Sequence, residues 1–198
     1  QKLFSEVRSR TGRDFSRYKI STITRRIQRR MQIYRINELQ EYLVFLQQNS
    51  EEAKKLSDDF LITVTNFFRD PDVFNKIEKD VIPGIFAKKQ MEDQIRIWTV
   101  GCATGEEAYS LAILFLEEAQ KQKNRITAIQ IFASDLHEHS LAKAREGFYP
   151  GDIEVDVSPD RLKKYFIKED GGYRVRKDVR EMVIFTPHNL LNDPPFSK

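Results

Sequence analysis

Ile95-Arg-Ile-Trp-Thr-Val100, followed without a break by Gly101-Cys-Ala-Thr-Gly105-Glu106-Glu107, is the stretch that decides the fold class. Its alternating β-branched and aromatic residues predict a strand over 95–100. The two glycines predict a tight turn, and apolar spacing over 106–118 predicts a helix. A strand, a Gly-rich turn and a helix in this order are typical of the cofactor cradle in doubly wound α/β folds.

The turn also limits the kind of cofactor that it could hold. It lacks the Gly-Lys-Ser/Thr of phosphate-binding loops, and its spacing departs from Gly-x-Gly-x-x-Gly. Gly101 has no Cβ, so the backbone can approach a ligand closely. Glu106 and Glu107 stand where a pyrophosphate would meet the helix N-terminus, so the turn suits a ligand with positive charge and hydroxyls, such as S-adenosylmethionine. The alternative is that these residues serve only the turn and the helix dipole.

A second acidic residue follows the next predicted strand, which covers 129–134. Asp135 stands at the end of this strand, before a helix predicted over 138–145. In a βαβ unit, an acid at this position can accept hydrogen bonds from both hydroxyls of a ribose. The alternative interpretation is that Asp135 only caps the helix that follows.

Further sequence blocks resemble one family. They are Thr63-Val-Thr-Asn-Phe-Phe-Arg69-Asp70, Gly101-Cys-Ala-Thr-Gly-Glu-Glu-Ala-Tyr-Ser110, Ser134-Asp-Leu, Ala144-Arg-Glu-Gly-Phe-Tyr149 and His188-Asn-Leu-Leu191. In this order, and over nearly the whole chain, they resemble the CheR-type chemotaxis receptor methyltransferases. The Asn-Phe-Phe-Arg-Asp and Gly-Glu-Glu-Ala-Tyr-Ser blocks are specific to that family.

The resemblance implies an enzyme that transfers a methyl group from S-adenosylmethionine to glutamate side chains of chemotaxis receptors, forming glutamyl methyl esters in sensory adaptation. It also implies which residues contact the cofactor or border its methyl group, in addition to Gly101 of the turn: Thr63, Thr65, Arg69, Glu106, Asp135, Asn189 and Leu190. Arg69 is the candidate catalytic residue, and a structural ion pair with Asp70 or Asp72 is its alternative role. A glutamate acceptor is already ionised at neutral pH, so methyl transfer to it requires alignment rather than a general base.

The predicted fold is α/β, with an all-α helical domain over 1–70, a linker helix over 71–94 and a Rossmann-like methyltransferase domain over 95–198. The helical domain has predicted helices over 2–10, 16–34, 38–48 and 51–60, the last two capped by Asn37 and Ser50. Asp70-Pro71 is a signal for the cap and first turn of the linker helix, which is expected to run from Pro71 to about Lys88 with an interruption near Pro83-Gly84.

An insertion over 147–180 is too long for an ordinary loop. The resemblance implies that it forms the small antiparallel β-subdomain that these methyltransferases insert at this point. Ser158 starts a short helix, and Gly171-Gly172 predicts a hairpin turn before a strand over 173–176. The hairpin turn is short, which argues against binding of a receptor C-terminal tail.

A third strand is predicted over 183–185, and the family continues with further strands after this region. We therefore expect only part of the parallel sheet, with one uncovered edge, and little or no methyl transfer by these 198 residues alone. Because the chain starts at Gln1, we also expect a longer parent protein.

The charge of the chain is strongly polarised. Residues 1–35 hold eleven Lys or Arg and two acids, a net charge of +9, so the remainder carries 3 − 9 = −6. Four arginines flank the apolar stripe of the helix predicted over 16–34: Arg25, Arg26, Arg29 and Arg30. We expect them to dock the acidic cytoplasmic helical domain of a receptor, with a merely solvated helix flank as the alternative.

Composition excludes several other classes. A single cysteine, Cys102, excludes internal disulfides and a cysteine-based metal site, and His137 and His139 are two apart and cannot share a helix face. No metal is therefore expected. The sequence contains no apolar run of the ~20 residues that span a bilayer, which predicts a cytoplasmic protein. A catalytically silent sensor or scaffold that binds S-adenosylmethionine or S-adenosylhomocysteine is a second possibility. A basic-helix nucleic-acid binder is a third, disfavoured because stacking aromatics are lacking.

Overall fold

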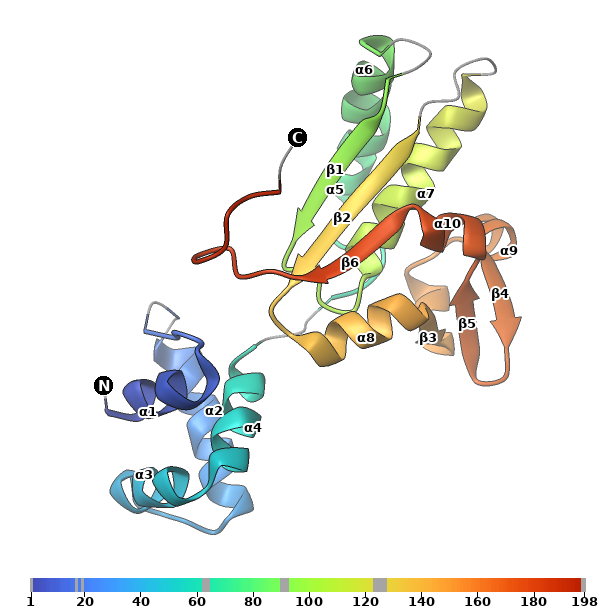
Figure 1. The fold of residues 1–198 in the computed structure, drawn as a ribbon. Coiled ribbons are helices and arrows are strands. Elements are labelled where there is room, and N and C mark those ends of the chain that lie inside the picture. Colours follow the sequence, from blue (N-terminus) through green and yellow to red (C-terminus); the bar gives the residue numbers. More distant parts are fainter. Residues whose placement is uncertain are drawn as a thin grey trace. The chain divides into compact units, whose positions relative to one another are not determined.

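The computed structural model describes residues 2–16, 18, 20–61, 65–89, 93–122 and 128–196, and the chain divides into two compact units, Gln1–Ile62 and Thr63–Lys198 (Figure 1). The first unit ends at residue 62, whereas the sequence predicted a helical domain that ends at residue 70. The reason is that Phe67 is buried in the core of the second unit, together with residues of its sheet and helices. Within the described residues, no helix is long and apolar enough to cross a membrane.

The described part of the first unit is helical, with α1 (Lys2–Thr11), α2 (Ile20–Ile33), α3 (Leu39–Gln48) and α4 (Ser50–Phe60). Their apolar faces share one core, in which Val7, Ile23 and Leu56 are among the buried residues. The start of α2 was predicted too early, at residue 16. The chain turns there, because the N–H of Ser16 donates to Asp14 and Phe15 packs its ring against Phe60.

The predicted caps of the next two helices differ from the observed ones. Glu38, not Asn37, precedes α3, and Asn49 occupies the N-cap position of α4 with Ser50 as its first residue. Neither cap makes a side-chain hydrogen bond to its helix.

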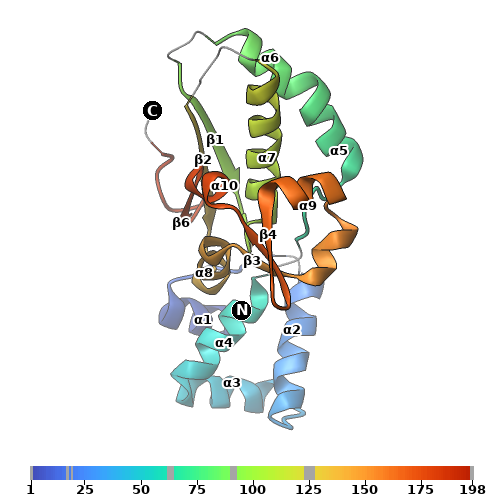
Figure 2. The same cartoon turned by 90° about the vertical axis from the view of Figure 1, so that its right-hand side faces the viewer.

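The second unit contains a parallel sheet of β1 (Ile95–Val100), β2 (Ile129–Asp135) and β6 (Val183–Pro187), in the order β1-β2-β6. The chain leaves β1 through α7 (Glu106–Lys121) and leaves β2 through α8 (Glu138–Glu146), the insertion and α10 (Lys177–Glu181). Because both crossovers advance in the same direction along the sheet, the right-handed rule puts their helices on one face (Figures 1 and 2). The predicted α/β class with an all-α N-terminal domain is confirmed.

The two faces of this sheet are covered differently. Ile131 and Ala133 are fully buried against Ile113 of α7 and Leu141 of α8. On the opposite face, the segment after β6 returns across the strands (Figure 2), and the ring of Phe196 lies 5.5 Å from that of Phe132 and 5.1 Å from that of Trp98. Among the described strands, β1 pairs only with β2.

The helix before β1 consists of α5 (Pro71–Lys76), a π-helical turn η1 (Ile77–Val81) and α6 (Ile82–Ala87). The helix is therefore interrupted about one turn earlier than predicted, at Ile77–Val81 rather than near Pro83-Gly84. The wider π turn brings Pro83 into the first turn of α6, where its missing N–H breaks no helical hydrogen bond. Phe74 and Phe86 of this helix pack with Phe115 of α7, so it belongs to the second unit and is not a free linker.

The insertion forms the small antiparallel sheet that was predicted, with β3 (Phe148–Pro150), β4 (Phe166–Glu169) and β5 (Gly172–Val175) in the order β3-β5-β4. A 3-10 turn η2 (Gly151–Val155) and α9 (Pro159–Tyr165) complete it. The hydroxyl of Ser158 accepts from the N–H of Arg161 and so caps α9 as predicted. Gly172 is required because a Cβ there would lie 2.1 Å from the carbonyl oxygen of Tyr149.

Candidate functional site

The turn after β1 is shaped by residues with positive φ. Gly101, Ala103 and Gly105 have φ of 68°, 47° and 96°. A Cβ on Gly105 would lie 2.9 Å from Cβ of Ala144, so this glycine serves the packing of the turn on α8. A Cβ on Gly101 would have no atom within 4 Å, so the turn is open on that side. Gly101 is therefore the position at which a ligand could approach the backbone.

Asp135 holds this turn from the carboxyl end of β2. One carboxylate oxygen accepts from the N–H of Ala103 at 2.8 Å, and the other accepts from the N–H of His137 at 2.9 Å. The N-cap position of α8 is occupied by His137, so Asp135 is not that helix's cap. Each carboxylate oxygen can accept a second hydrogen bond, so the side chain is oriented for a ligand and still has acceptor capacity.

Glu106, the first residue of α7, is buried, with 8% of its surface exposed. Burial raises the pKa of its carboxyl group, while hydrogen bonds from Thr104 and Thr65 act in the opposite direction. The Thr104 hydroxyl lies 2.8 and 2.7 Å from the two carboxylate oxygens. Thr104 was not among the predicted site residues. Its backbone carbonyl accepts from the hydroxyl of Tyr149, so the insertion also supports the turn.

Arg69 is exposed and lies in a segment tied to the same helix. The N–H of Phe68 donates to the hydroxyl of Ser110 at 3.0 Å, and that hydroxyl donates to the carbonyl of Glu106 at 2.7 Å. Burial raises the pKa of Glu107, and the charge of Arg69 acts to lower it. Asp70 occupies the predicted N-cap position of α5, and Pro71 is the first residue of that helix. Asp70 has φ of 58°, and its side chain makes no capping hydrogen bond.

The remaining predicted contacts follow β6. The N–H of His188 donates to the carbonyl of Asp135, which brings this end of β6 beside the end of β2. Asn189 uses its side-chain oxygen to accept from the N–H of Leu191, and Leu190 is 57% exposed. Thr63 lies outside the described residues.

The four arginines of α2 do not form one surface, contrary to the prediction. Arg30 is 11% exposed and makes two hydrogen bonds to Glu52, the one from Nε at 2.8 Å, with Asp59 at 3.8 Å. The hydroxyl of Tyr42 donates to the same carboxylate at 2.6 Å. Arg25 and Arg29 are exposed, and Arg26 is half-buried with its Nε enclosed. Arg30 therefore stabilises the first unit and is removed from the candidate docking surface.

The turn, α7 and the end of β2 together form a site rich in carboxylates. The side-chain donors to Glu106 are neutral hydroxyls, so a cationic ligand group would offset the cost of burying its charge. Asp135 retains acceptors suited to a pair of hydroxyls. This donor set fits the amino group, sulfonium and ribose of S-adenosylmethionine. Among the described residues, no group of three His, Cys, Asp or Glu could hold a metal ion.

Comparison with known families gives two matches that together span most of the chain. Residues 63–198 match the CheR methyltransferase SAM-binding domain, and residues 1–61 match the CheR methyltransferase all-alpha domain. The first match indicates S-adenosylmethionine as the cofactor.

Individual relatives agree with these matches. An uncharacterized 104.1 kDa protein of Rhodobacter capsulatus is 39% identical over 98% of this chain, which spans only 20% of that protein. A chemotaxis protein methyltransferase of Borreliella burgdorferi is 29% identical over 100% of the chain, which spans 71% of it. Chemotaxis protein methyltransferase 2 of Vibrio cholerae is 30% identical over 92% of the chain, which spans 64% of it. With both domain matches in chain order, this chain belongs to the CheR methyltransferase family.

Proposed function

We propose that this protein is a protein-glutamate O-methyltransferase that forms methyl esters on glutamate side chains of chemotaxis receptors. The observation that carries the proposal is the placement of Arg69, an exposed cation, on the segment bound to α7 beside the carboxylates of the candidate cofactor turn. The names of the Borreliella and Vibrio relatives, both chemotaxis protein methyltransferases, support it. In this proposal, residues 63–198 hold the cofactor and residues 1–62 meet the receptor.

The proposed division of work requires little acid–base chemistry from the chain. S-adenosylmethionine, when bound, supplies an electrophilic methyl group. Glu106, Asp135 and the Gly101 turn hold the cofactor, and Arg69 holds the acceptor carboxylate through a charge-assisted, bidentate hydrogen bond. The acceptor is ionised at neutral pH, so no side chain has to remove a proton. Alignment of this kind is worth ~7–11 kcal/mol in favourable cases.

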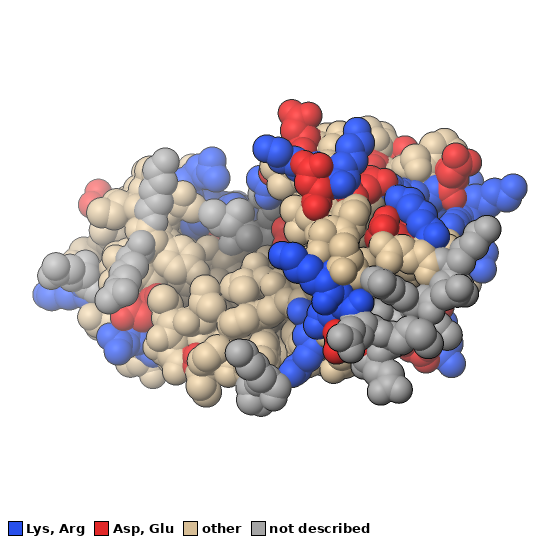
Figure 3. Space-filling view, turned by 90° about the horizontal axis from the view of Figure 1, so that it is seen from above, with Lys and Arg blue, Asp and Glu red and all other residues tan. Residues whose placement is uncertain are grey.

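The proposed partner is the acidic, helical cytoplasmic domain of a receptor, which would require a cytoplasmic location. Arg25 and Arg29 on α2 are the exposed cations that suit it. A nucleic-acid partner receives less support. On the coloured part of the face in Figure 3, Lys and Arg are interspersed with Asp and Glu, so that face presents no continuous basic surface.

The test is methyl transfer by the protein as its gene encodes it. Tritiated S-adenosylmethionine is incubated with membranes that carry the organism's chemotaxis receptors, and base-labile methanol is measured as the signature of a methyl ester. We expect transfer by the native protein and a large loss in Arg69→Ala. Binding of S-adenosylhomocysteine in calorimetry without any transfer would instead support the sensor or scaffold. Neither binding nor transfer would leave the nucleic-acid binder.

A further inference from the structure

The segment that carries Arg69 is held in a strained conformation. Phe68 and Asp70, on either side of Arg69, have φ of 48° and 58°, a region that residues with a Cβ rarely occupy. Such strain costs free energy and persists only where the surroundings impose it. The contacts of Phe68 should therefore show what keeps Arg69 in place.

Phe68 packs against the buried clusters of the second unit, and specific contacts from different parts of that unit also hold it. Its N–H donates to Ser110 of α7, and its ring meets the ring of Phe74 edge-on at 5.6 Å. The guanidinium of Arg161, from α9 in the insertion, lies over the same ring with Cζ 4.6 Å from the ring centre. A second link to the insertion is the hydrogen bond from Asn66 to Asp156, at 3.0 Å.

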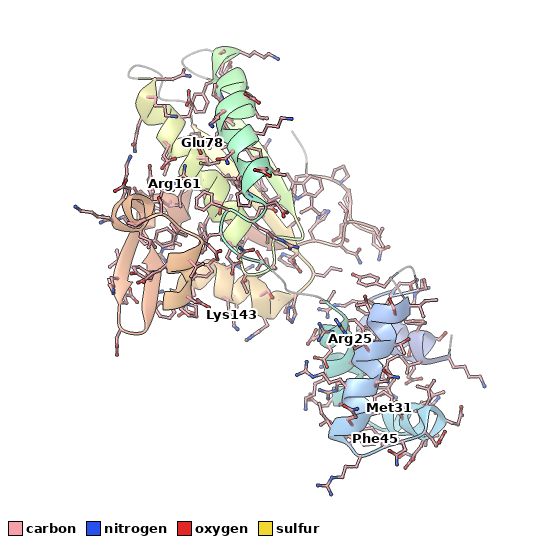
Figure 4. All side chains as sticks on the ribbon, turned by 180° about the vertical axis from the view of Figure 1, so that it is seen from behind. Arg25, Met31, Phe45, Glu78, Lys143 and Arg161 are labelled. Carbon is pink, nitrogen blue, oxygen red and sulfur yellow. The ribbon has the colours of Figure 1, made fainter. Side chains whose placement is uncertain are left out.

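Arg161 is itself held on two sides. Its Nε and Nη2 donate to the two carboxylate oxygens of Glu117 at 3.1 and 2.7 Å, and Nη2 also lies 3.1 Å from a carboxylate oxygen of Glu78. Figure 4 shows Arg161, which belongs to α9, and Glu78, which belongs to the π-helical turn η1. Only a guanidinium can make a bidentate pair and at the same time lay a flat cation on a ring. The side chain is 22% exposed, so water competes with these contacts only in part.

Open space lies beside this arrangement. A cavity of about 280 Å³ is lined by residues that include Phe68, Arg69, Asp70 and Arg161. Because the cavity is not filled by other side chains, the ring of Phe68 has room to move if the guanidinium above it is removed. The contact from Arg161 should therefore matter more for the position of the Phe68 ring than an ordinary packing contact.

We propose that Arg161 is a positioning residue for Arg69: its guanidinium, fixed by Glu117 and Glu78, covers Phe68 and keeps the strained segment against α7. The proposal rests on the proposed function, in which Arg69 touches the acceptor. It assigns the insertion a role in aligning the acceptor.

The test compares Arg161→Met and Arg161→Lys with Lys163→Met, an exposed residue of the same helix, as the matched control. The first readout is hydrogen exchange of a peptide over 65–74, followed by mass spectrometry, which needs no activity. We expect exchange at the Phe68 amide to accelerate about tenfold or more in both Arg161 variants, and the control to match the native protein. Arg161→Lys keeps the positive charge beside Glu117 and Glu78, so it remains informative if Arg161→Met fails to fold.

The second readout is kinetic. We expect kcat to fall about 100-fold in the Arg161 variants, since small displacements of aligned groups cost this much, while the dissociation constant of S-adenosylhomocysteine stays within about twofold. Unchanged exchange in both variants would overturn the proposal, and so would accelerated exchange with an unchanged kcat. If the native protein transfers no methyl group, the proposed function fails, and the exchange result alone decides whether Arg161 holds the segment.

Discussion

At the scale of single residues, Asp135 combines a structural and a ligand-binding position in one carboxylate. The backbone N–H groups of Ala103 and His137 orient it, one on each oxygen. A carboxylate oriented in this way loses little freedom when a ligand binds, because its side-chain entropy has already been lost on folding. Its substitution should therefore affect both the turn and the ligand.

We predict that Asp135→Ala weakens binding of S-adenosylhomocysteine by ~2 kcal/mol or more, because two hydroxyls lose a charged acceptor. Asp135→Asn, which keeps one acceptor oxygen, should lose less. Titration calorimetry measures both, with the exposed Glu138→Ala as a control on the neighbouring helix. Native affinity in a folded Asp135→Ala would reduce this residue to a clamp for the turn.

The residues of the candidate turn could be predicted to different degrees. Gly101, Glu106 and Asp135 follow from the local order of strand, turn and helix, which the sequence pattern reveals. Thr104, Ser110 and Tyr149 could not be predicted as supporting residues. The hydrogen bonds from Tyr149 to Thr104 and from Phe68 to Ser110 join segments that are distant along the chain, and no local pattern encodes such contacts. The contact of Thr104 with Glu106 is local, two residues apart, but it has no signature in the sequence.

At the scale of elements, α2 shows how a basic helix divides its charges. Arg26 and Arg30 are four residues apart and lie toward the first unit's interior, whereas Arg25 and Arg29 lie on the exposed flank. Glu52 of α4 binds Arg30, and this partner could not be inferred from α2 alone. The four-residue spacing correctly predicted that Arg25 pairs with Arg29 and Arg26 with Arg30 along the helix. It did not predict that only the pair of Arg25 and Arg29 is exposed.

We predict that Arg25→Glu combined with Arg29→Glu raises the apparent KM for receptor roughly tenfold at low salt and weakens its salt dependence. Affinity for S-adenosylhomocysteine should not change, since both residues belong to the first unit. Lys54→Glu with Lys55→Glu, two exposed residues of α4, is the matched charge-reversal control. Equal KM values in the two double variants would mean that only net charge matters and that α2 is not the docking surface.

Strand and helix types could be predicted better than their ends. Residues 95–100 form the predicted strand, because alternation of side chains is a property of the strand alone. The π turn before Pro83 could not be predicted, because it depends on how Phe74 and Phe86 both reach the core beside α7. Tertiary packing determined the position of that interruption.

At the scale of the whole molecule, the two units respond in opposite ways to acid at their buried carboxylates. Burial by itself would raise the pKa of Glu52, but hydrogen bonds from Arg30, Tyr42 and Tyr34 outweigh it, and the pKa is lowered from 4.5. The pKa of Glu106 is raised from the same value by burial. Glu52 therefore contributes stability above pH 4.5 that is lost as pH falls through its lowered pKa. Glu106 takes up its proton at a higher pH than an ordinary glutamate, and the free-energy cost of burying the side chain then falls.

We predict that acid removes cofactor affinity before it weakens the helical unit. As pH falls toward 4.5, protonation of Glu106 should reduce affinity for the cationic S-adenosylmethionine while the helices stay intact. Below 4.5, protonation of Glu52 should cost Arg30 the carboxylate that binds it most closely, with Asp59 only at 3.8 Å, and lower the helical signal in circular dichroism. Because Trp98, the single tryptophan, belongs to the second unit, its fluorescence reports on that unit separately.

Two variants assign these transitions to the two carboxylates. Glu106→Gln has no proton to gain and should flatten the pH profile of affinity measured by calorimetry. Glu52→Gln should lower helical stability at every pH and reduce its dependence on acid, because Arg30 then lacks its closest carboxylate throughout and Asp59 lies 3.8 Å away. Loss of the helical signal at a higher pH than the loss of affinity would contradict the predicted order. In that case a carboxylate of the first unit would take up a proton before Glu106 does. The hydrogen bonds from Arg30 and Tyr42 would then not outweigh the effect of burial on the pKa of Glu52.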